Sequence, residues 1–382
     1  MQSTDTASPV QVLALADDLT GALEIGAKFA GAGIQSVVTA AARPRADRPV
    51  LVIDTQTRHL GAQEAYRGVR TLAESARGGN PRLVYKKTDS TLRGNIGSEL
   101  AALVDVFAGP LLYAPAYPEM GRTVRRGRLY VDGVPVSETA FARDLLNPIR
   151  ESDISRAIGD RVLARSIDST SLGSVREAGV YILDGESDED LRVAARFLLA
   201  SDVIRLAAGP AAFAGRLAER IDLPRAAGAG LPVVRTCLVV NGSLHEISAG
   251  QARYAVDHGW PAPTPEGVAE AIRSSGWAIL RAGEAAAGEG VERARDLGGV
   301  VREILNKVAL DALVVFGGDT AAGIVHALGD PPIFPVREVV PGVALSRLPA
   351  AGLGCLITKA GGFGAADILS RLRELLTKER CE

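Results

Sequence analysis

The sequence predicts an α/β protein with two domains, each a mostly parallel sheet flanked by helices. Short apolar runs alternate with segments of helical periodicity along the chain, which is typical of parallel sheets. A stretch of small residues bounded by prolines, 223–232, separates two such alternations and is the best candidate for a linker. The length of 382 residues suits this division. The domains are therefore expected at 10–222 and 233–382, after a disordered tail at 1–9.

The first domain is expected to open with a strand at 10–16 and a helix at 19–30, whose small residues allow close packing on a sheet. Its further strands are expected at 35–39, 50–54, 82–85, 111–114, 180–184 and 203–206, and its further helices at 62–77, 97–106, 188–200 and 210–221. An Asp-Gly pair within 129–136 predicts an inserted β-hairpin, which could form a flap over a pocket.

The second domain repeats a unit of strand, polar loop and helix three times. The strands of these units are expected at 236–243, 312–316 and 355–358, with a further strand at 277–282 and helices at 246–257 and 290–310. In open α/β sheets, ligands bind at the carboxyl ends of the strands. The loops that follow the strands are therefore the candidate binding residues in both domains.

Composition and charge narrow the class of protein. Apolar residues make up 47% and charged residues 23%, as in ordinary globular proteins. The net charge of −2 gives no general attraction to nucleic acid or to an anionic membrane, and no apolar run is long enough to span a membrane. Three scattered cysteines favour a reducing compartment, and the start of the chain lacks the features of a signal peptide. We therefore expect a cytoplasmic protein without nucleic-acid or membrane partners.

The loops of the first domain are rich in groups that bind a hydroxylated acid. Asp17 and Asp18 follow the first strand, Arg58 follows the third, and residues 86–95 follow the fourth. Aspartate accepts hydrogen bonds from hydroxyl groups, whereas lysine and arginine bind a carboxylate. Other interpretations stay open, because such an aspartate can simply cap the next helix and Arg58 can be a surface residue. The basic run at 122–128 can likewise be a solvated face.

Three glycine-rich loops in the second domain are similar to phosphate-binding loops. They lie at 241–243, 317–320 and 359–364, and each precedes an expected helix. Glycine lets backbone N–H groups approach an anion, and the N-terminus of a helix adds positive potential. One such loop often serves turn geometry alone, but three after successive strands indicate a nucleotide. Magnesium could enter with the nucleotide phosphates, and Asp319 is the candidate carboxylate for it.

Several signatures are missing from the sequence. It contains no Gly-Lys dipeptide, which excludes a P-loop, and no G-x-G-x-x-G motif, which counts against a Rossmann dinucleotide site. The motifs of protein kinases are missing too, and the four histidines lie outside any metal-binding spacing. A sugar acid in one domain and a nucleotide in the other make phosphoryl transfer the economical hypothesis.

Six blocks of the sequence resemble, in the right order, those of the four-carbon acid sugar kinase family. They are Ala-Asp-Asp-Leu-Thr-Gly-Ala at 16–22, Lys-Thr-Asp-Ser-Thr-Leu-Arg-Gly-Asn at 87–95, the loop at 115–123, and the loops at 242–243, 317–320 and 361–364. The resemblance covers about residues 10–375. It implies a sugar-acid substrate-binding domain at 10–222 and a nucleotide-binding domain at 233–382.

The family resemblance also implies an activity. That activity is ATP-dependent phosphorylation of the terminal hydroxyl of D-threonate, D-erythronate or 3-oxo-tetronate. The form Lys-Lys-Thr-Asp-Ser at 86–90 is more similar to the threonate and erythronate kinases, so a 3-oxo-tetronate kinase is the alternative. Asp319 stands where some members carry Glu, which leaves its role in placing magnesium open.

By position, the resemblance implies that Asp18, Arg58 and residues 87–90 hold the substrate, and that Ser243, residues 317–320 and Gly361 hold ATP. The full set of residues expected to bind the substrate is Asp17, Asp18, Arg58, Lys86, Lys87, Thr88, Asp89, Ser90, Arg93 and Arg122. The full set expected to bind the nucleotide is Ser243, Gly317, Gly318, Asp319, Thr320, Lys359, Gly361 and Gly362. Asp18 and Asp89 are the candidate catalytic residues, because either could orient or deprotonate the attacking hydroxyl.

Two other classes of protein remain as alternatives. A non-catalytic sugar-acid-binding protein needs the loops of the first domain but not the glycine-rich loops. A dehydrogenase or aldolase-like enzyme is disfavoured by the missing dinucleotide motif and metal ligands. The sequence leaves open the stereochemistry of the acid and whether the chain forms a homo-oligomer.

Overall fold

The computed structural model describes residues 10–40, 48–144, 147–243, 245–281, 290–349 and 352–378. The chain divides into two compact units, Met1–Ala226 and Ala227–Glu382. This division falls inside the stretch 223–232, which the sequence marks as a linker. The tail predicted at 1–9 lies outside the described residues. Within the described residues, no helix is both long enough and apolar enough to cross a membrane.

The N-terminal unit is built on an eight-stranded sheet in the order β2-β3-β1-β4-β11-β5-β10-β9, and all its described pairs are parallel. The strands are β1 (Val12–Ala16), β2 (Ser36–Ala40), β3 (Val50–Asp54), β4 (Leu83–Lys87), β5 (Pro110–Tyr113), β9 (Ala164–Ile167), β10 (Gly179–Leu183) and β11 (Leu206–Gly209). Every residue of β1, β3 and β4 is buried, as expected for parallel strands covered on both faces.

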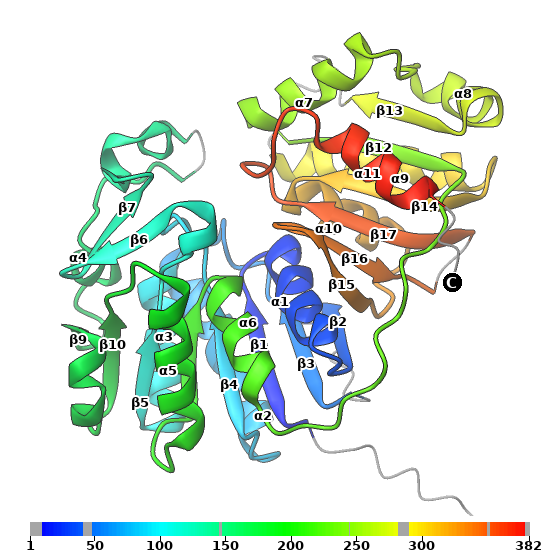
Figure 1. Ribbon diagram of the computed structural model, residues 1–382. Coiled ribbons are helices and arrows are strands. Elements are labelled where there is room, and N and C mark those ends of the chain that lie inside the picture. The colour runs from blue at the N-terminus through cyan, green and yellow to red at the C-terminus, as the bar shows by residue number, and fades with distance from the viewer. Residues whose placement is uncertain are drawn as a thin grey trace, which may run out of the picture. The chain divides into compact units, whose positions relative to one another are not determined.

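Helices cover both faces of this sheet (Figure 1). One layer holds α1 (Leu19–Gly31), α5 (Asp188–Ala200) and α6 (Ala211–Arg220), and the other holds α2 (Ala62–Arg77), α3 (Ile96–Phe107) and α4 (Ile154–Ile158). Right-handed crossovers in opposite directions along the sheet place the two groups on opposite faces. Helix α2 shows why such segments form: Ala65, Val69 and Ala73 recur every four residues and form its buried stripe.

A small antiparallel sheet is inserted after β5. It consists of β6 (Arg122–Arg125), β7 (Arg128–Val131) and β8 (Val134–Pro135). The hairpin predicted at 129–136 is confirmed, and its turn residues Asp132 and Gly133 have φ values of 50° and 82°, as a tight hairpin turn requires. The turn before it, Arg126-Gly127, also has positive φ values. The basic run at 122–128 is therefore a second hairpin, which the sequence did not predict because arginine is a weak turn signal.

The C-terminal unit holds a six-stranded sheet in the order β13-β12-β14-β17-β16-β15. Its strands are β12 (Cys237–Asn241), β13 (Trp277–Arg281), β14 (Leu310–Phe316), β15 (Phe334–Val340), β16 (Val343–Arg347) and β17 (Leu353–Lys359). Its helices are α7 (Glu246–Asp257), α8 (Val268–Ser275), α9 (Gly290–Leu305), α10 (Gly318–Ala327) and α11 (Ile368–Thr377). The first four strands in this order pair in parallel, and the last two join antiparallel.

Two buried cysteines lie in the core of this second sheet. Cys237 and Cys355 pair in register with Ala312 from either side of β14, so two strand spacings, about 9–10 Å, separate them. This is too far for a disulfide, and both thiols are free. Burial raises the pKa of Cys237 well above its usual range and that of Cys355 to about 12.

Several elements differ from the sequence prediction, and the following three differ for local reasons. Helix α9 ends at Leu305 rather than at 310, because Val308 in the connection and Leu310 at the start of β14 continue the apolar spacing of the helix. Strand β11 spans Leu206–Gly209 instead of 203–206, because it is built of small residues with weak strand preference. The pair β15 and β16 was not predicted, since prolines around 331–341 indicate a loop. Strand β15 tolerates Pro335 because it lies at the edge of the sheet.

Candidate functional site

The acidic and basic residues of the N-terminal unit lie at one edge of its sheet. Ala16, the last residue of β1, pairs in register with Asp54 at the end of β3 and with Lys87 at the end of β4. The loops that follow these three neighbouring strands therefore begin side by side. This is the edge at which open α/β sheets bind ligands.

Arg58 ties the two aspartates of the first loop together. Its Nε and Nη2 donate to the two carboxylate oxygens of Asp17 at 2.8 and 2.9 Å, and its Nη1 donates to Asp18 Oδ2 at 2.6 Å. The arginine side chain is only 12% exposed. We expected Arg58 to fork onto a ligand carboxylate, but its fork is directed at Asp17. Burial acts to raise the pKa of Asp17, but Arg58 and Lys86 outweigh it and hold that pKa below its usual value.

Asp18 takes the capping role that the sequence allowed, and it also pairs with Arg58. Its Oδ1 accepts the backbone N–H of Gly21 at 2.9 Å and so caps helix α1. Its Oδ2 faces the cation of Arg58. Gly94, with a φ of +90°, lets the loop at 86–95 pass close to Asp17, because a Cβ there would lie 3.0 Å from Asp17 Oδ2.

Asp89 is held by its own loop. Its Oδ1 pairs with Arg93 Nη2 at 2.7 Å, and its Oδ2 accepts from Arg93 Nε at 3.1 Å and from the Thr91 N–H at 2.9 Å. The Thr91 hydroxyl also donates to it. Burial alone would raise the pKa of Asp89, but Arg93 and Arg58 hold it well below its usual range. Asp89 is thus an ionised carboxylate whose hydrogen-bonding capacity is largely filled.

The two lysines belong to strand β4, and their side chains point to opposite faces of the sheet. Lys86 is fully buried and pairs with Glu99 of helix α3 at 3.1 Å. Lys87 faces helix α1, where its Nζ lies 3.8 Å from Glu24 Oε2. A Cβ on Gly21 would lie 2.9 Å from the Lys87 Nζ, so this ammonium sits against the start of α1, next to the loop of Asp18. The alternation of strand side chains explains why Lys86 pairs with α3 and Lys87 lies against α1.

The remaining predicted substrate residues surround this cluster. Thr88 and Ser90 are buried, at 1% and 7% exposure. Arg122 lies on β6, where its guanidinium donates to the Met120 carbonyl and lies 5.9 Å from the ring of Phe141. Burial lowers the pKa of Arg122, and the charge of nearby Asp132, followed by that of Asp89, acts against this.

Sequence reasoning missed two acidic groups of this cluster. Glu99 pairs with Lys86 and accepts a hydrogen bond from the Thr57 hydroxyl. Asp54, at the end of β3, is 2% exposed and accepts the Gln56 N–H at 3.2 Å. Burial first, and then the charge of Asp18, raise the pKa of Asp54 to about 8. The position of Asp54 as the last residue of a buried strand is the feature of the sequence that could have identified it as a site residue.

We expect Asp54 to make the stability of the N-terminal unit depend on pH. A carboxyl whose folded pKa is about 8 against an ordinary 3.8 binds more protons in the folded state between these values. Its contribution is fully present below about pH 4 and is lost as pH rises through about 8. Asp54→Asn keeps a neutral side chain at every pH. The free energy of unfolding, measured with urea and circular dichroism, should therefore fall less between pH 5 and pH 8.5 in Asp54→Asn than in the unmodified protein. The exposed Asp105→Asn should leave the pH profile unchanged, and an unchanged profile in Asp54→Asn would contradict the assignment.

The three glycine-rich loops of the C-terminal unit meet at the carboxyl ends of neighbouring strands. Asn241 of β12 pairs in register with Phe316 of β14, which pairs with Lys359 of β17. A Cβ on Gly361 would lie 2.6 Å from Ser243 Oγ, so the backbones approach each other closely there. Gly317 has a φ of +100° immediately before helix α10. These loops have the close backbone approach and helix N-terminus that phosphate groups need, and they fit a nucleotide.

The other residues predicted to bind the nucleotide lie around these three glycine-rich loops. Gly318 begins helix α10, and Thr320 in its first turn is buried. Asp319 lies in the same turn and is half-buried. Gly362 lies against His245, since a Cβ on it would be 3.3 Å from the imidazole Nε2. Among the described residues, no group of three or more His, Cys, Asp or Glu side chains could hold a metal ion.

Lys359 stabilises the third glycine-rich loop, at 359–364. Its Nζ donates to the carbonyls of Ala360 and Phe363, each at 2.9 Å, and lies 4.5 Å from the centre of the Phe316 ring. The side chain is fully buried, and burial lowers the pKa of Lys359 to about 7. We expected Lys359 to contact the nucleotide, but its ammonium is directed at the carbonyls of its own loop and fixes the shape of that loop.

Comparison with known proteins agrees with this division of sites. A family described as a sugar-binding N-terminal domain matches residues 12–217, and one described as a nucleotide-binding C-terminal domain matches residues 269–369. The D-threonate kinase of Bordetella bronchiseptica is 32% identical to this chain, over 96% of the chain and 97% of the relative. The chain belongs to the four-carbon acid sugar kinase family.

Other known proteins are similar to this chain over almost their full length. The 3-oxo-tetronate kinase of Methylobacterium radiotolerans is 28% identical over 95% of this chain and 98% of the relative. A crystal structure from B. bronchiseptica, described as a domain-swapped dimer with bound citrate, is 30% identical, covers 98% of this chain and 100% of that one, and has a TM-score of 0.50.

One further crystal structure shares the fold. It comes from Salmonella typhimurium and is described as a putative tRNA synthase. It aligns with a TM-score of 0.75 at 20% identity, over 95% of this chain and 99% of that one. At this identity the likeness concerns the fold alone.

Proposed function

We propose that this protein is an ATP-dependent kinase that phosphorylates the terminal hydroxyl of a four-carbon sugar acid, of the D-threonate or D-erythronate class, to its 4-phosphate. As a member of its family the protein is a sugar-acid kinase. The observation that carries the finer proposal is the cluster of Asp17, Asp18 and Arg58 beside Lys87. The substrate class rests on the 32% identity to a D-threonate kinase and on the sequence Lys-Lys-Thr-Asp-Ser at 86–90.

The charges of the N-terminal unit suggest how the acid is held. Arg58 is occupied by Asp17 and Asp18, and Arg93 is occupied by Asp89. Lys87, whose nearest carboxylate lies at 3.8 Å, is the cation best placed to bind the substrate carboxylate. Ser90 and Thr88, next along the chain, would bind hydroxyl groups of the acid.

Asp18 is the better candidate for the base that takes the proton of the attacking hydroxyl. Each of its oxygens accepts one described hydrogen bond, from Gly21 and from Arg58, which leaves acceptor capacity for a substrate hydroxyl. Asp89 accepts from Arg93, from the Thr91 N–H and from the Thr91 hydroxyl, so it would hold its loop in shape. A general base must lie within hydrogen-bonding reach of the proton it removes.

The C-terminal unit would hold the nucleotide. Backbone N–H groups of Gly317–Thr320 and Gly361 would bind its phosphates, with the N-terminus of α10 adding positive potential. When bound, ATP with magnesium supplies the phosphoryl group and neutralises its charge, and Asp319 would provide a carboxylate for the metal. Lys359 would keep the third loop open to the phosphates by binding its carbonyls on the other side.

Gly317→Ala should weaken nucleotide binding. A φ of +100° strains any other residue by about 1–3 kcal/mol, so the loop before α10 would change shape. We expect the KM for ATP to rise about tenfold or more while the KM for the acid stays within about twofold, since a strain of this size corresponds to roughly one to two powers of ten. The control is Gly299→Ala in helix α9, where a Cβ meets nothing within 4 Å. Equal effects of the two changes on the KM for ATP would contradict the assignment of the loop before α10 to phosphate binding.

The activity itself is tested by following conversion of ATP to ADP with a panel of four-carbon sugar acids. D-threonate or D-erythronate should be consumed with the higher kcat/KM, and 3-oxo-tetronate with the lower. The opposite order would favour the 3-oxo-tetronate kinase, whose relative is 28% identical. Binding of an acid without release of ADP from any member of the panel would favour a non-catalytic sugar-acid-binding protein.

Two further properties belong to this proposal. The domain-swapped dimer of the B. bronchiseptica structure leads us to propose a homo-oligomer, which light scattering of the purified protein would test. Use of ATP, together with the scattered cysteines, leads us to propose the cytoplasm as its location. Fractionation of cells that express the protein would test that location.

A further inference from the structure

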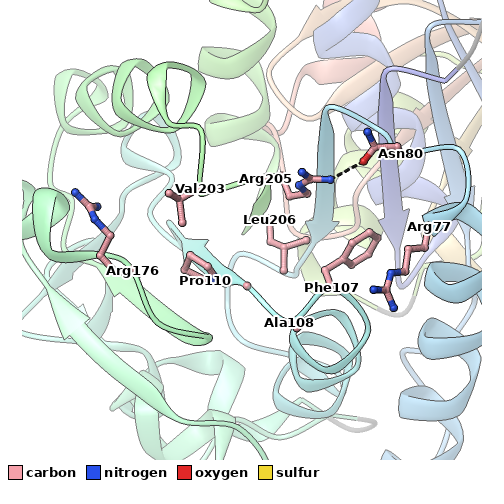
Figure 2. Close-up of a pocket in the computed structure, with 10 residues that line it drawn as sticks. Arg77, Asn80, Phe107, Ala108, Pro110, Arg176, Val203, Arg205 and Leu206 are labelled. Atoms are coloured by element: carbon pink, nitrogen blue, oxygen red, sulfur yellow. Dashed lines mark hydrogen bonds between the residues drawn. The ribbon is translucent and has the colours of Figure 1, made fainter.

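A cavity of about 460 Å³ lies in the N-terminal unit, at the amino ends of the sheet strands. It is lined by Arg77, Asn80, Phe107, Ala108, Gly109, Pro110, Arg176, Val203, Arg205 and Leu206. These residues come from the ends of α2 and α3 and from the segments that enter β4, β5, β10 and β11, four neighbouring strands (Figure 2). The acidic and basic cluster described above lies at the carboxyl ends of the sheet, so the cavity is a separate place in the fold.

The charge of this cavity is unbalanced. Three arginines line it, and none of its ten lining residues carries a carboxylate. Arg205 Nη1 donates to the amide oxygen of Asn80 at 2.6 Å, and Arg176 Nη1 donates to the Val175 carbonyl at 2.8 Å. None of the three forms an ion pair with another described residue. Glu177, next to Arg176 in sequence, instead forms an ion pair with Arg165, with Arg165 Nη1 at 3.3 Å from Glu177 Oε2.

Helix ends act against this positive charge but are weaker than it. Arg77 is the last residue of α2, and Phe107 is the last residue of α3, so both helices direct their carboxyl ends toward the cavity. Each helix end carries roughly half a negative charge at most. Three guanidinium groups exceed this, and each presents several N–H donors in a planar fork. The cavity therefore favours an oxyanion.

One wall of the cavity is apolar. It contains Phe107, Pro110, Val203 and Leu206, of which Val203 is 48% exposed. Small-molecule sites usually combine such a wall with a few polar groups and enclose about 300–1,000 Å³. An inorganic ion alone would leave this wall uncovered, whereas a small organic anion would cover it.

We propose that this cavity is a second ligand site, which binds a small organic molecule bearing a phosphate group or two carboxylates. Arg77, Arg176 and Arg205 bind its oxyanion groups, and the apolar wall covers its carbon skeleton. The shared chemistry is two or more negatively charged oxygens on a compact molecule. Strands β4 and β11 lead from this cavity to Lys87 and Gly209 at the other edge of the sheet, about 13–17 Å away for strands of four or five residues.

The test uses the full chain and two probes, pyrophosphate for the phosphate chemistry and succinate for the dicarboxylate chemistry. Calorimetric titration should detect binding of at least one of them. The double variant Arg77→Gln and Arg205→Gln should weaken that binding about tenfold to a hundredfold, because charge-assisted hydrogen bonds to two arginines are lost. Arg67→Gln is the matched control, since Arg67 is an exposed arginine of the same helix α2 outside the cavity.

Hydrogen exchange identifies the place of binding, because pyrophosphate could also occupy the loops proposed for the nucleotide. The bound probe should slow exchange at amides of 107–109 and 203–206, and the double variant should remove this protection. The proposal is overturned if neither probe binds, if the protection is confined to the C-terminal unit, or if Arg67→Gln weakens binding as much as the double variant. A tighter response to pyrophosphate than to succinate would assign the phosphate chemistry, and the reverse would assign the dicarboxylate.

Discussion

Asp18→Asn should lower kcat by at least about a hundredfold, since general-base catalysis contributes roughly 10²–10⁴-fold. Asparagine keeps the size of the side chain and is as good a helix cap as aspartate, so the hydrogen bond from Gly21 and helix α1 should survive. What disappears is the charge that orients and accepts the proton of the attacking hydroxyl. The KM for the acid should change much less than kcat, because the lost interaction belongs to the transition state.

The control for this change is another aspartate that caps a helix. Asp153 accepts the Arg156 N–H at 3.1 Å at the start of α4, so Asp153→Asn alters a capping carboxylate outside the cluster and should leave kcat unchanged. Asp89→Asn completes the set. If Asp18→Asn keeps a tenth or more of the activity while Asp89→Asn loses it, the base is Asp89. If neither loses about a hundredfold, neither aspartate acts as a base.

Arg58→Gln should destabilise the N-terminal unit by about 3–5 kcal/mol, the usual cost of removing one partner of a buried ion pair. Its side chain is 12% exposed and donates three hydrogen bonds to Asp17 and Asp18. Without it, the carboxylate of Asp17, which is 2% exposed, would remain buried beside Asp18 with less compensation. Arg70→Gln removes an exposed arginine paired with Glu74 at 2.8 Å and should change little.

The two tryptophans allow unfolding of the C-terminal unit to be followed separately. The sequence contains only Trp260 and Trp277, and both lie in the C-terminal unit. Urea unfolding of Arg58→Gln should therefore shift the transition seen by circular dichroism, while the transition seen by tryptophan fluorescence keeps its midpoint. A shift below about 1 kcal/mol in the circular dichroism transition would mean that this ion pair behaves like a surface pair.

The sequence was sufficient to place most candidate groups at the carboxyl ends of the strands in each sheet. Asp17, Arg58 and Lys87 follow or end neighbouring strands, and the three glycine loops follow β12, β14 and β17, because polar loops after buried strands share one edge. This rule requires only the order of apolar runs and loops. It works without knowledge of which side chains meet.

The partners of these groups could not be predicted in the same way. Lys86 pairs with Glu99 because strand residues alternate between faces and α3 covers the face of Lys86, which depends on the packing of that helix. Asp54 owes its raised pKa to burial and to Asp18, 36 positions away in sequence. The arginines of the second cavity come from separate segments of the chain, and only the sheet order β4-β11-β5-β10 brings them together.

The two cysteines in the core of the C-terminal unit give the protein a built-in probe of its own opening. Thiol reagents attack the thiolate, and burial keeps Cys237 and Cys355 protonated and out of reach while that unit is folded. Since the chain has three cysteines, a Cys381→Ser variant carries only these two. The rate at which they are labelled then reports how often the unit opens. A nucleotide bound to the folded unit should slow the labelling, whereas an acid bound to the N-terminal unit should leave it unchanged.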